Sequence, residues 1–531
     1  MLNPRRTLCV CIVGLALVLS GASGALAQKY GGVLRIEHRE SPPSLSIHQE
    51  ATISTVAPMM SAYDNVVQYD WSKPLDGPDT IVPDLAESWF WSDRGKKLTF
   101  RLRRGVQWHD GQPFSAADVK DTFDIVRGAS SKRMKLNPRE LWYFNVADIT
   151  TNGDYEVTFH LKRPQPSLLS LLATGYSPVH PAHIPPDELR TREVGTGPFM
   201  LKTYLRDQSM EFVKNPNYFE KGRPYLDGIT WIIIRSRPSR TAALQAGQAD
   251  AAFPGETSQA IYETLKSAVP TMAFQRVGVQ VSDNIIVNTK KPPFDNVKLR
   301  QSINLALDRS AMIKSVHQGF ALEGGANQPG PYSFWGLSEK DTQKLPGYGD
   351  AAKNKAAARK LLASLGYTQQ KPLKVTVSTR AIAIYVDVAT WVVDQLKQVG
   401  IDGTLEQVET GNWHAKVARR DFDIALNLTG VGPDDPDANF YENYACGSQR
   451  NYSDYCSEEM MKLFDKQSAE TDTKKRLKLV HEIDVKLQQE VARPILSHRL
   501  DWFATWPYVK NMVAHHSLYN WHRYTNVWLD K

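Results

Sequence analysis

Three carboxylates crowd one short loop of this chain, within the stretch TGVGPDDPDANFYENYACG over 429–447. Asp434, Asp435 and Asp437 lie there among glycines and prolines, directly after an apolar run. Such a cluster suits a calcium site, a pair of catalytic acids or a loop that receives a ligand. The loop lacks the order of acids, glycine and glutamate that an EF-hand requires. Two interpretations stay open: a structural turn whose Asp side chains cap backbone N–H groups, and a loop that faces a ligand.

The sequence motifs of common enzymes are missing. The chain contains no GxxxxGK[ST], GxSxG, HExxH or CxxC, and no complete GxGxxG. His180 and His183 lie in a proline-rich stretch, which predicts solvated histidines of a surface loop. His515 and His516 are adjacent and would point apart in an extended strand. We therefore predict no enzymatic activity, no cofactor and no metal site.

The N-terminus has the form of a secretory signal. Arg5 and Arg6 precede an apolar run over 8–19, and Ala25-Leu26-Ala27 has the small-x-small form of a cleavage site. We predict cleavage after Ala27 and export of a chain of 504 residues, which is the 531 of the whole chain less these 27. Its net charge would be +5, because the +7 of the whole chain loses two arginines. That charge is spread out, so nucleic acid is not an expected partner.

Two cysteines remain after the predicted cleavage. They are Cys446 and Cys456, which follow the acidic loop. In an oxidising compartment, a lone pair at this spacing most simply forms one disulfide. The expected role of this disulfide is to order the segment after the acidic loop.

Strand-like and helix-like segments alternate along the chain, which predicts an α/β protein. Ser115 and Asp118 form a capping box for one helix. Further helices are predicted after Asn296, around 388–399 and after Asp472. The helix around 388–399 is bracketed by the strand-like segments LKVTVST and DGTLEQV, which predicts a parallel pair of strands. The aromatic tail over 502–531 is expected to pack against the rest of the chain.

Several motifs allow a comparison with known proteins when they are taken in order. They are IVPDLAESWFWSDRGKKLTFRLRRGVQWHDGQPFSAADV, VGTGPF, NPNYF with GRPYLDGI, LQAGQADAA and PFDNVKLRQSINLALDR. In this combination the chain resembles extracellular solute-binding proteins of family 5, the periplasmic dipeptide-, oligopeptide- and nickel-binding components of ABC importers. The resemblance covers essentially the whole exported chain.

The resemblance implies a two-lobe, hinged α/β fold of the large type with an extra N-terminal subdomain. Lobe one would comprise 28–282 and 505–531, and lobe two would comprise 283–504. The chain would cross between the lobes near Val281 and return near Trp502. The implied function is capture of a small solute, foremost a peptide, between the lobes in the periplasm. A monomer would then deliver the solute to the permease of an ABC importer in the inner membrane.

The resemblance also implies roles for particular residues. Arg380 stands where dipeptide-binding members place an arginine on the ligand's carboxylate, and its planar guanidinium suits bidentate pairing. Trp413 stands where those members have a tryptophan in the pocket wall, although core packing would equally explain an indole there. Cys446 and Cys456 stand where those members carry a disulfide.

Val431 is a departure from the pattern of the dipeptide-binding members. They have at this position an aspartate that pairs with the α-amino group of the peptide, and an apolar residue cannot replace that contact. Either Asp434 or Asp435 takes over from a shifted loop, or the ligand lacks a free amine. Peptide binding is the first hypothesis. The alternatives are a binding protein for a non-peptide carboxylate or a metal chelate, and a sensory or chaperone-like periplasmic protein of the same fold.

Overall fold

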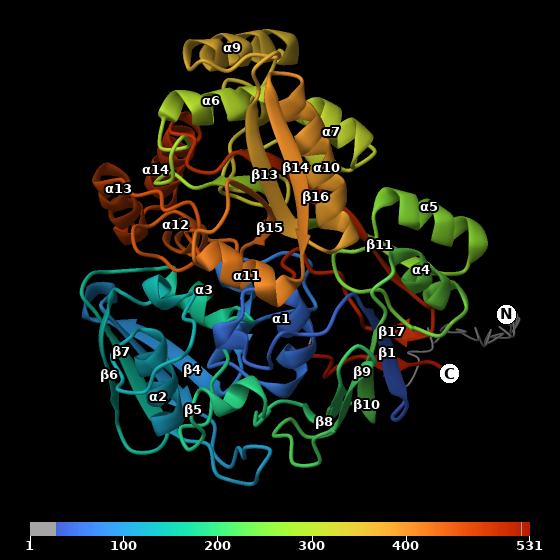
Figure 1. Ribbon diagram of the computed structural model, residues 1–531. Helices are drawn as coiled ribbons and strands as arrows, with labels where there is room; N and C mark the ends of the chain where they lie inside the picture. The colour runs from blue at the N-terminus through green and yellow to red at the C-terminus, as the bar shows by residue number, and fades with distance from the viewer. Residues whose placement is uncertain (1–27, 522) are drawn as a thin grey trace, which may run out of the picture.

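The computed structural model describes residues 28–521 and 523–531, which form two lobes (Figure 1). The predicted signal segment 1–27 and its cleavage site lie outside the described residues. None of the helices in the described part of the chain combines the length and the apolar character that a membrane span requires. The arrangement of helices and sheets in two lobes confirms the two-lobe α/β fold predicted from the sequence.

The lobe that is lower in Figure 1 is built on two four-stranded sheets, of strand order β1-β10-β9-β8 and β4-β5-β7-β6. Its strands are β1 (Val33–His38), β2 (Val67–Tyr69), β3 (Ile81–Pro83), β4 (Ala86–Ser92), β5 (Lys97–Leu102), β6 (Val146–Thr151), β7 (Glu156–Leu161), β8 (Phe199–Leu205), β9 (Ser209–Lys214) and β10 (Gly228–Ile233). Its helices are α1 (Ile53–Met59), α2 (Ala116–Val126) and α3 (Leu168–Ala173), with α4 (Arg237–Gln245) and α5 (Gln259–Ala268) at one side.

The upper lobe is built on a six-stranded sheet of order β12-β16-β11-β15-β13-β14. Its strands are β11 (Ala273–Val287), β12 (Ala321–Leu322), β13 (Leu373–Arg380), β14 (Ile401–Val408), β15 (Ile424–Gly430) and β16 (Ile495–Thr505). Its helices are α6 (Val297–Ala306), α7 (Arg309–Ser315), α8 (Glu339–Thr342), α9 (Ala351–Ser364), α10 (Ala383–Lys397), α11 (Thr410–Ala418), α12 (Pro436–Asn443), α13 (Glu458–Ala469) and α14 (Thr473–Gln489).

Local signals in the sequence account for several of these elements. The hydroxyl of Ser115 accepts a hydrogen bond from the backbone N–H of Ala117, and the carboxylate of Asp118 accepts one from the N–H of Ser115 at 2.8 Å, so the predicted capping box is present. Strands β13 and β14 precede and follow α10 in the chain, and they pair in parallel, as predicted. Asp472 caps α14 by accepting from two backbone N–H groups.

Two long antiparallel strands connect the lobes. Strand β11 pairs with β16 from Ala273↔Thr505 onward, and its second half also pairs with β15. The crossing points expected near Val281 and Trp502 lie within these two strands. Ala251 bridges both Ile36 of β1 and Thr505 of β16, and this links the sheets of the two lobes. A hinge made of paired strands is suited to rotate the lobes while each sheet stays intact.

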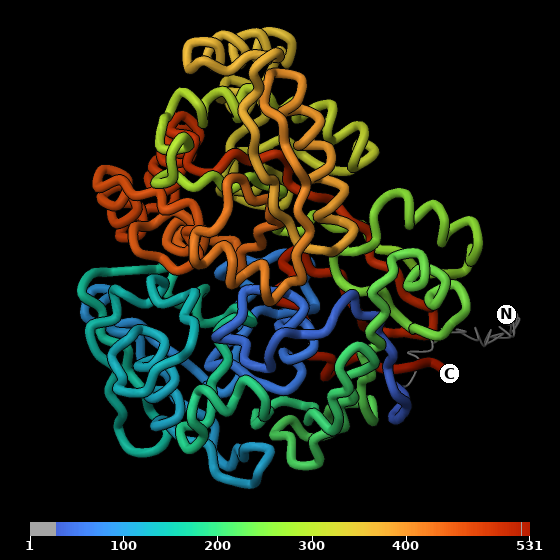
Figure 2. The backbone as a smooth tube through the Cα atoms, in the orientation of Figure 1, coloured from blue at the N-terminus to red at the C-terminus, as the bar shows by residue number. Residues whose placement is uncertain are grey.

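The aromatic tail packs against the lower lobe, as expected. It contains β17 (Val509–Lys510) and β18 (Trp528–Leu529), and the ring of Tyr519 is buried. Figure 2 shows this red segment running down from the upper lobe to end near the blue N-terminal strand. The Lys29 ammonium lies 2.8 Å from the Asp530 carboxylate, so the two ends of the described chain are joined by an ion pair.

Candidate functional site

The acidic loop is tied into the upper lobe through Asp435. Its carboxylate accepts a hydrogen bond from the N–H of Asp437 at 2.9 Å and so caps α12. The same carboxylate receives both terminal nitrogens of Arg476, at 2.8 and 2.7 Å, in a bidentate pair. These contacts give Asp435 the structural role that the turn interpretation predicts.

Asp437 holds the two lobes together. Its fully buried carboxylate accepts hydrogen bonds from Gln165 and Ser167 of the lower lobe. From the upper lobe it accepts hydrogen bonds from Gln467 and, at 2.7 Å, from Ser468. The first turn of α12 thus joins the two lobes.

Asp434 and Val431 line a small cavity of about 30 Å³. The Asp434 carboxylate accepts from the Ser333 hydroxyl at 2.7 Å and from the N–H of Phe334 at 3.3 Å. Burial, assisted by the charges of Asp76 and Asp435, raises the pKa of Asp434 to about 7. Asp434 therefore takes up a proton in the folded protein at a pH where an ordinary aspartate is ionised.

Replacement of Asp434 by asparagine is expected to change how stability depends on pH. Between about pH 4 and pH 7 the unfolded Asp434 is ionised while the folded one keeps its proton, so the wild type loses stability as the pH rises. The neutral amide removes this loss, and the variant should gain on the order of 1–3 kcal/mol over the wild type across that range. Urea denaturation at several pH values measures the difference. The exposed Asp421→Asn is the control, and a pH-independent difference for Asp434→Asn would contradict the assigned pKa.

The loop around Val431 is pressed against the lower lobe. The N–H of Val431 donates to the carbonyl of Gln280 at 3.2 Å. A Cβ on Gly430 would lie 2.3 Å from the ring of Tyr519, and a Cβ on Gly432 would lie 2.6 Å from the hydroxyl of Thr174. Both positions require glycine because no side chain fits between the lobes there.

Arg380 is buried at the end of β13, and its guanidinium group contacts the lower lobe. Its terminal nitrogen lies 2.7 Å from the Glu40 carboxylate, which follows β1. The other nitrogens donate to the Tyr385 hydroxyl at 2.7 Å and the Thr410 hydroxyl at 3.0 Å. The sequence analysis did not include Glu40 among the site residues. The local signal for it is the pair of adjacent charged residues, Arg39 and Glu40, directly after β1. The guanidinium that was expected to meet a ligand carboxylate is thus paired with a carboxylate of the protein.

Trp413 lies in α11 and has no exposed surface. It packs in a cluster with Ile286 and Phe422, which is the core packing that the sequence left open. Its neighbour His414 and the nearby Tyr452 line the larger pocket of the interface. Trp413 therefore supports the wall of that pocket from behind.

A pocket of about 700 Å³ lies where the two lobes meet. The lower lobe contributes Gln49, Glu50 and Lys135, and the upper lobe contributes Arg450 and the segment that carries the disulfide. Its size and its walls from both lobes match those of sites for small ligands.

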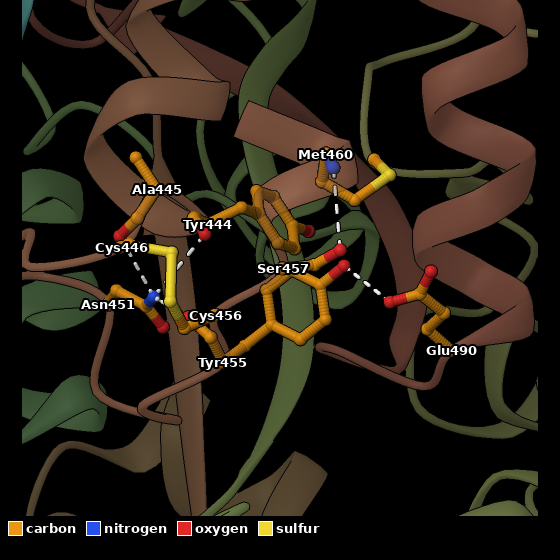
Figure 3. The surroundings of a disulfide bond; sticks show 9 residues. All are labelled: Tyr444, Ala445, Cys446, Asn451, Tyr455, Cys456, Ser457, Met460 and Glu490. Atoms are coloured by element: carbon orange, nitrogen blue, oxygen red, sulfur yellow. Dashed lines mark hydrogen bonds between the residues drawn. A yellow bond between two sulfur atoms is a disulfide. The ribbon is translucent and has the colours of Figure 1, made fainter. Parts of the chain in front are cut away.

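The predicted disulfide is present between Cys446 and Cys456 (Figure 3). The amide of Asn451 lies inside the closed loop and donates to the carbonyls of Ala445 at 3.0 Å and Tyr455 at 2.6 Å. The disulfide and this amide together order a wall of the larger pocket.

The histidines correct two expectations. The rings of His515 and His516 do not point apart but stack at 5.1 Å, and both face Asp76, at 3.0 and 3.9 Å. Among the described residues, these three form a group compact enough to hold a metal ion. His180 is not a solvated loop histidine, because its ring packs 4.5 Å from that of His48. In both cases contacts with residues distant in the sequence set the orientation of the histidine rings, which the local sequence does not predict.

Residues 80–451 match the model of bacterial extracellular solute-binding proteins, family 5. The chain belongs to this family. Among curated proteins, this solute-binding protein is 26% identical over 496 residues to a probable di/tripeptide-binding protein of Pseudomonas aeruginosa, and the match covers 86% of this chain and 88% of the relative. It is 30% identical over 362 residues to a glutathione-binding protein of Escherichia coli O1:K1 / APEC, covering 67% of each chain.

Solved structures share the fold of this solute-binding protein. An ABC transporter-associated periplasmic binding protein of Helicobacter pylori in complex with the peptide STSA has a TM-score of 0.83 at 23% identity, covering 95% of this chain and 99% of that one. The protein AgaA from A.tumefacien R10 in complex with agropinic acid has a TM-score of 0.80 at 21% identity, covering 94% and 99%. The family and these relatives are solute-binding proteins.

Proposed function

We propose that this protein captures a peptide between its lobes and delivers it to the permease of an ABC importer. The observation that carries the proposal is the pocket of about 700 Å³ with walls from both lobes. Family membership and the similarity to a probable di/tripeptide-binding protein support a peptide as the solute. We further propose that the protein is a periplasmic monomer without enzymatic activity, with its signal cleaved after Ala27 and its lobes divided near 282 and 505.

The sequence-predicted residues take different parts in this proposal. Val431 and Asp434 would contact the ligand once the small cavity widens as the lobes open, while Asp435 holds their loop and Trp413 supports the pocket wall. Arg380 acts at closure, and a ligand carboxylate would reach it by displacing one of its present contacts. Since ligand contacts made only in the closed form shift the population toward that form, groups at the lobe interface couple binding to closure.

Binding of the protein to di- and tripeptides tests the proposed function. We expect saturable binding by isothermal titration calorimetry of the exported chain, and native mass spectrometry of protein purified from periplasm should show a retained peptide. A retained solute that is not a peptide, together with no heat of binding for any peptide, would contradict the proposal.

Val431→Asp is expected to strengthen binding of dipeptides with a free α-amino group. The added carboxylate would offer the ammonium a charge-assisted hydrogen bond at the position where dipeptide-binding members have an aspartate, worth roughly 1.5–3 kcal/mol. Calorimetry with a dipeptide and its N-acetylated form measures the effect, and Val431→Asn is the matched uncharged control. Equal or weaker binding of the free dipeptide would rule out this geometry.

A further inference from the structure

Three buried arginines gather where the lobes meet. Arg139 precedes a short 3-10 helix (Glu140–Trp142) of the lower lobe, Arg450 lies in the disulfide loop, and Arg493 lies between α14 and β16. They are 2%, 3% and 3% exposed. Arg493 donates to the carbonyl of Arg450 at 3.3 Å. The charges of Arg139 and Arg450 both act on Tyr176, whose ring lies 3.9 Å from the Arg139 guanidinium.

Among the described residues, one carboxylate forms an ion pair with these three guanidinium groups. A second, that of Glu50, is within electrostatic reach of Arg139 but pairs with Arg190 at 3.4 Å. Glu442 lies 2.5 Å from Arg450 and is itself buried. Among the described residues, neither Arg139 nor Arg493 forms an ion pair. The terminal nitrogens of Arg139 donate to backbone carbonyls, including that of Ile47 at 2.8 Å. The cluster of Arg139, Arg450, Arg493 and Glu442 thus contains two positive charges in excess.

Several nitrogens of this arginine cluster have no hydrogen-bond partner in the part of the chain that the structure describes. They are Nε and Nη1 of Arg139, Nε of Arg450 and Nε of Arg493. Arg309 provides a contrast, because it is equally buried and lacks an ion pair among the described residues. All three of its nitrogens nevertheless donate hydrogen bonds, for example Nε to the carbonyl of Ile495 at 2.7 Å. Arg309 is therefore a satisfied structural arginine, whereas the arginine cluster retains unused donors.

Burial of these charges is unfavourable in the absence of an anion. Burial lowers the pKa of Arg139 below its usual range and that of Arg493 to about 10, and the charge of Arg450 acts in the same direction on both. A negatively charged group beside the cluster would reverse this effect and accept the unused hydrogen bonds.

The arginine cluster lies between the two cavities of the interface. Arg450 lines the larger pocket and Arg493 lines the smaller one beside Val431. Arg139 lines neither cavity itself, but it lies beside the cluster, because the charges of Glu442 and Arg450 both act on it. Its neighbour Pro138 lines the larger pocket. Lys135 and Lys290 add positive charge to that pocket. Of its two carboxylates, Asp454 is paired with Arg420 at 2.7 Å and Glu50 lies 3.4 Å from Arg190.

We propose that the arginine cluster holds an acidic side chain of the ligand, so that the solute is a peptide that contains glutamate or aspartate. This inference rests on the proposed peptide-binding function and defines its substrate class. The planar guanidinium groups from both lobes would meet a carboxylate only when the lobes are closed. Recognition of the acidic group would therefore be coupled to closure.

Calorimetry with the exported chain and the isosteric peptides Ala-Glu-Ala and Ala-Gln-Ala tests the inference. We expect Ala-Glu-Ala to bind at least tenfold more tightly, because the amide cannot compensate the excess charge. Equal affinities, or a preference for Ala-Gln-Ala, would overturn the acidic class while leaving the peptide function intact. Binding of neither peptide, when other peptides bind, would overturn the inference, whereas no binding of any peptide would contradict the peptide function and the inference with it.

Variants from both lobes assign the preference to the cluster. Arg493→Met and Arg139→Met should each lower the affinity for Ala-Glu-Ala at least tenfold while changing that for Ala-Gln-Ala less than threefold. Arg493→Lys keeps the charge and should retain part of the preference. The exposed Arg359→Met on α9 is the control and should leave the preference unchanged. Circular dichroism checks that each variant folds, and a preference that survives both methionine variants would overturn the assignment.

Discussion

Replacing Glu40 with alanine is expected to shift the ligand-free protein toward an open form. The buried ion pair of Glu40 with Arg380 joins the two lobes at 2.7 Å. Although burial alone would raise the pKa of Glu40, the charges of Arg380 and Arg39 hold it below its usual value. Removing one member of a buried pair leaves an uncompensated charge and costs roughly 3–5 kcal/mol. In the open form Arg380 would regain water, so this cost falls on the closed form alone.

Small-angle X-ray scattering of the ligand-free protein measures the shift as an increased radius of gyration. Glu406→Ala is the matched control, because it removes an ion pair with Lys416 that lies within the upper lobe and is partly exposed. Arg380→Ala should open the protein as well. The double variant Glu40→Ala with Arg380→Ala should be less open than the sum of the single effects predicts. Identical scattering of Glu40→Ala and the wild type would contradict a role of this pair in closure.

Asp437→Asn is expected to lower the free energy of unfolding by roughly 3–5 kcal/mol, because a buried acceptor is replaced by a group that also donates. The four side chains around the carboxylate all donate to it: Gln165, Ser167, Gln467 and Ser468. An amide nitrogen placed among these donors leaves hydrogen bonds unmade on both sides. Arg476, 3.5 Å away, would also lose part of its compensating charge.

Urea denaturation followed by tryptophan fluorescence measures this loss. The exposed Asp421→Asn makes the same chemical change in the same lobe and should shift the free energy of unfolding by less than about 0.5 kcal/mol. Since Asp437 also joins the lobes, its variant should show a wider or a split transition if the lobes unfold separately. An unchanged midpoint would show that the partners of Asp437 satisfy one another without it.

Much of the fold was predictable because its signals are local. The capping box at Ser115 and the cap at Asp472 each involve groups two or three residues apart, so the spacing of residue types is sufficient to recognise them. The parallel pair around α10 followed from the periodicity of three consecutive segments. The disulfide followed from the count of cysteines in an exported chain.

The candidate site was predictable only in part. The loop around Val431 does line a cavity, but Asp435 and Trp413 proved to be engaged in the structure of the upper lobe. Arg493 lies within the otherwise apolar segment VARPIL, and this is a local signal of a buried charge. The burial of Arg139 had no comparable signal, because it depends on the packing of distant segments.

The family, the alternation of helices and strands and the position of the acidic loop were all recognisable from the order of residues alone. The charges that lie together became evident in the folded chain. Arg380 pairs with Glu40 across 340 residues, and Arg450 lies near Arg139 and Arg493 at the lobe interface. Caps and periodicity act over one or two turns of the chain, so short sequence patterns are sufficient to recognise them. A buried charge, by contrast, requires a partner because its surroundings have a low dielectric constant, and these surroundings form only when the lobes are packed.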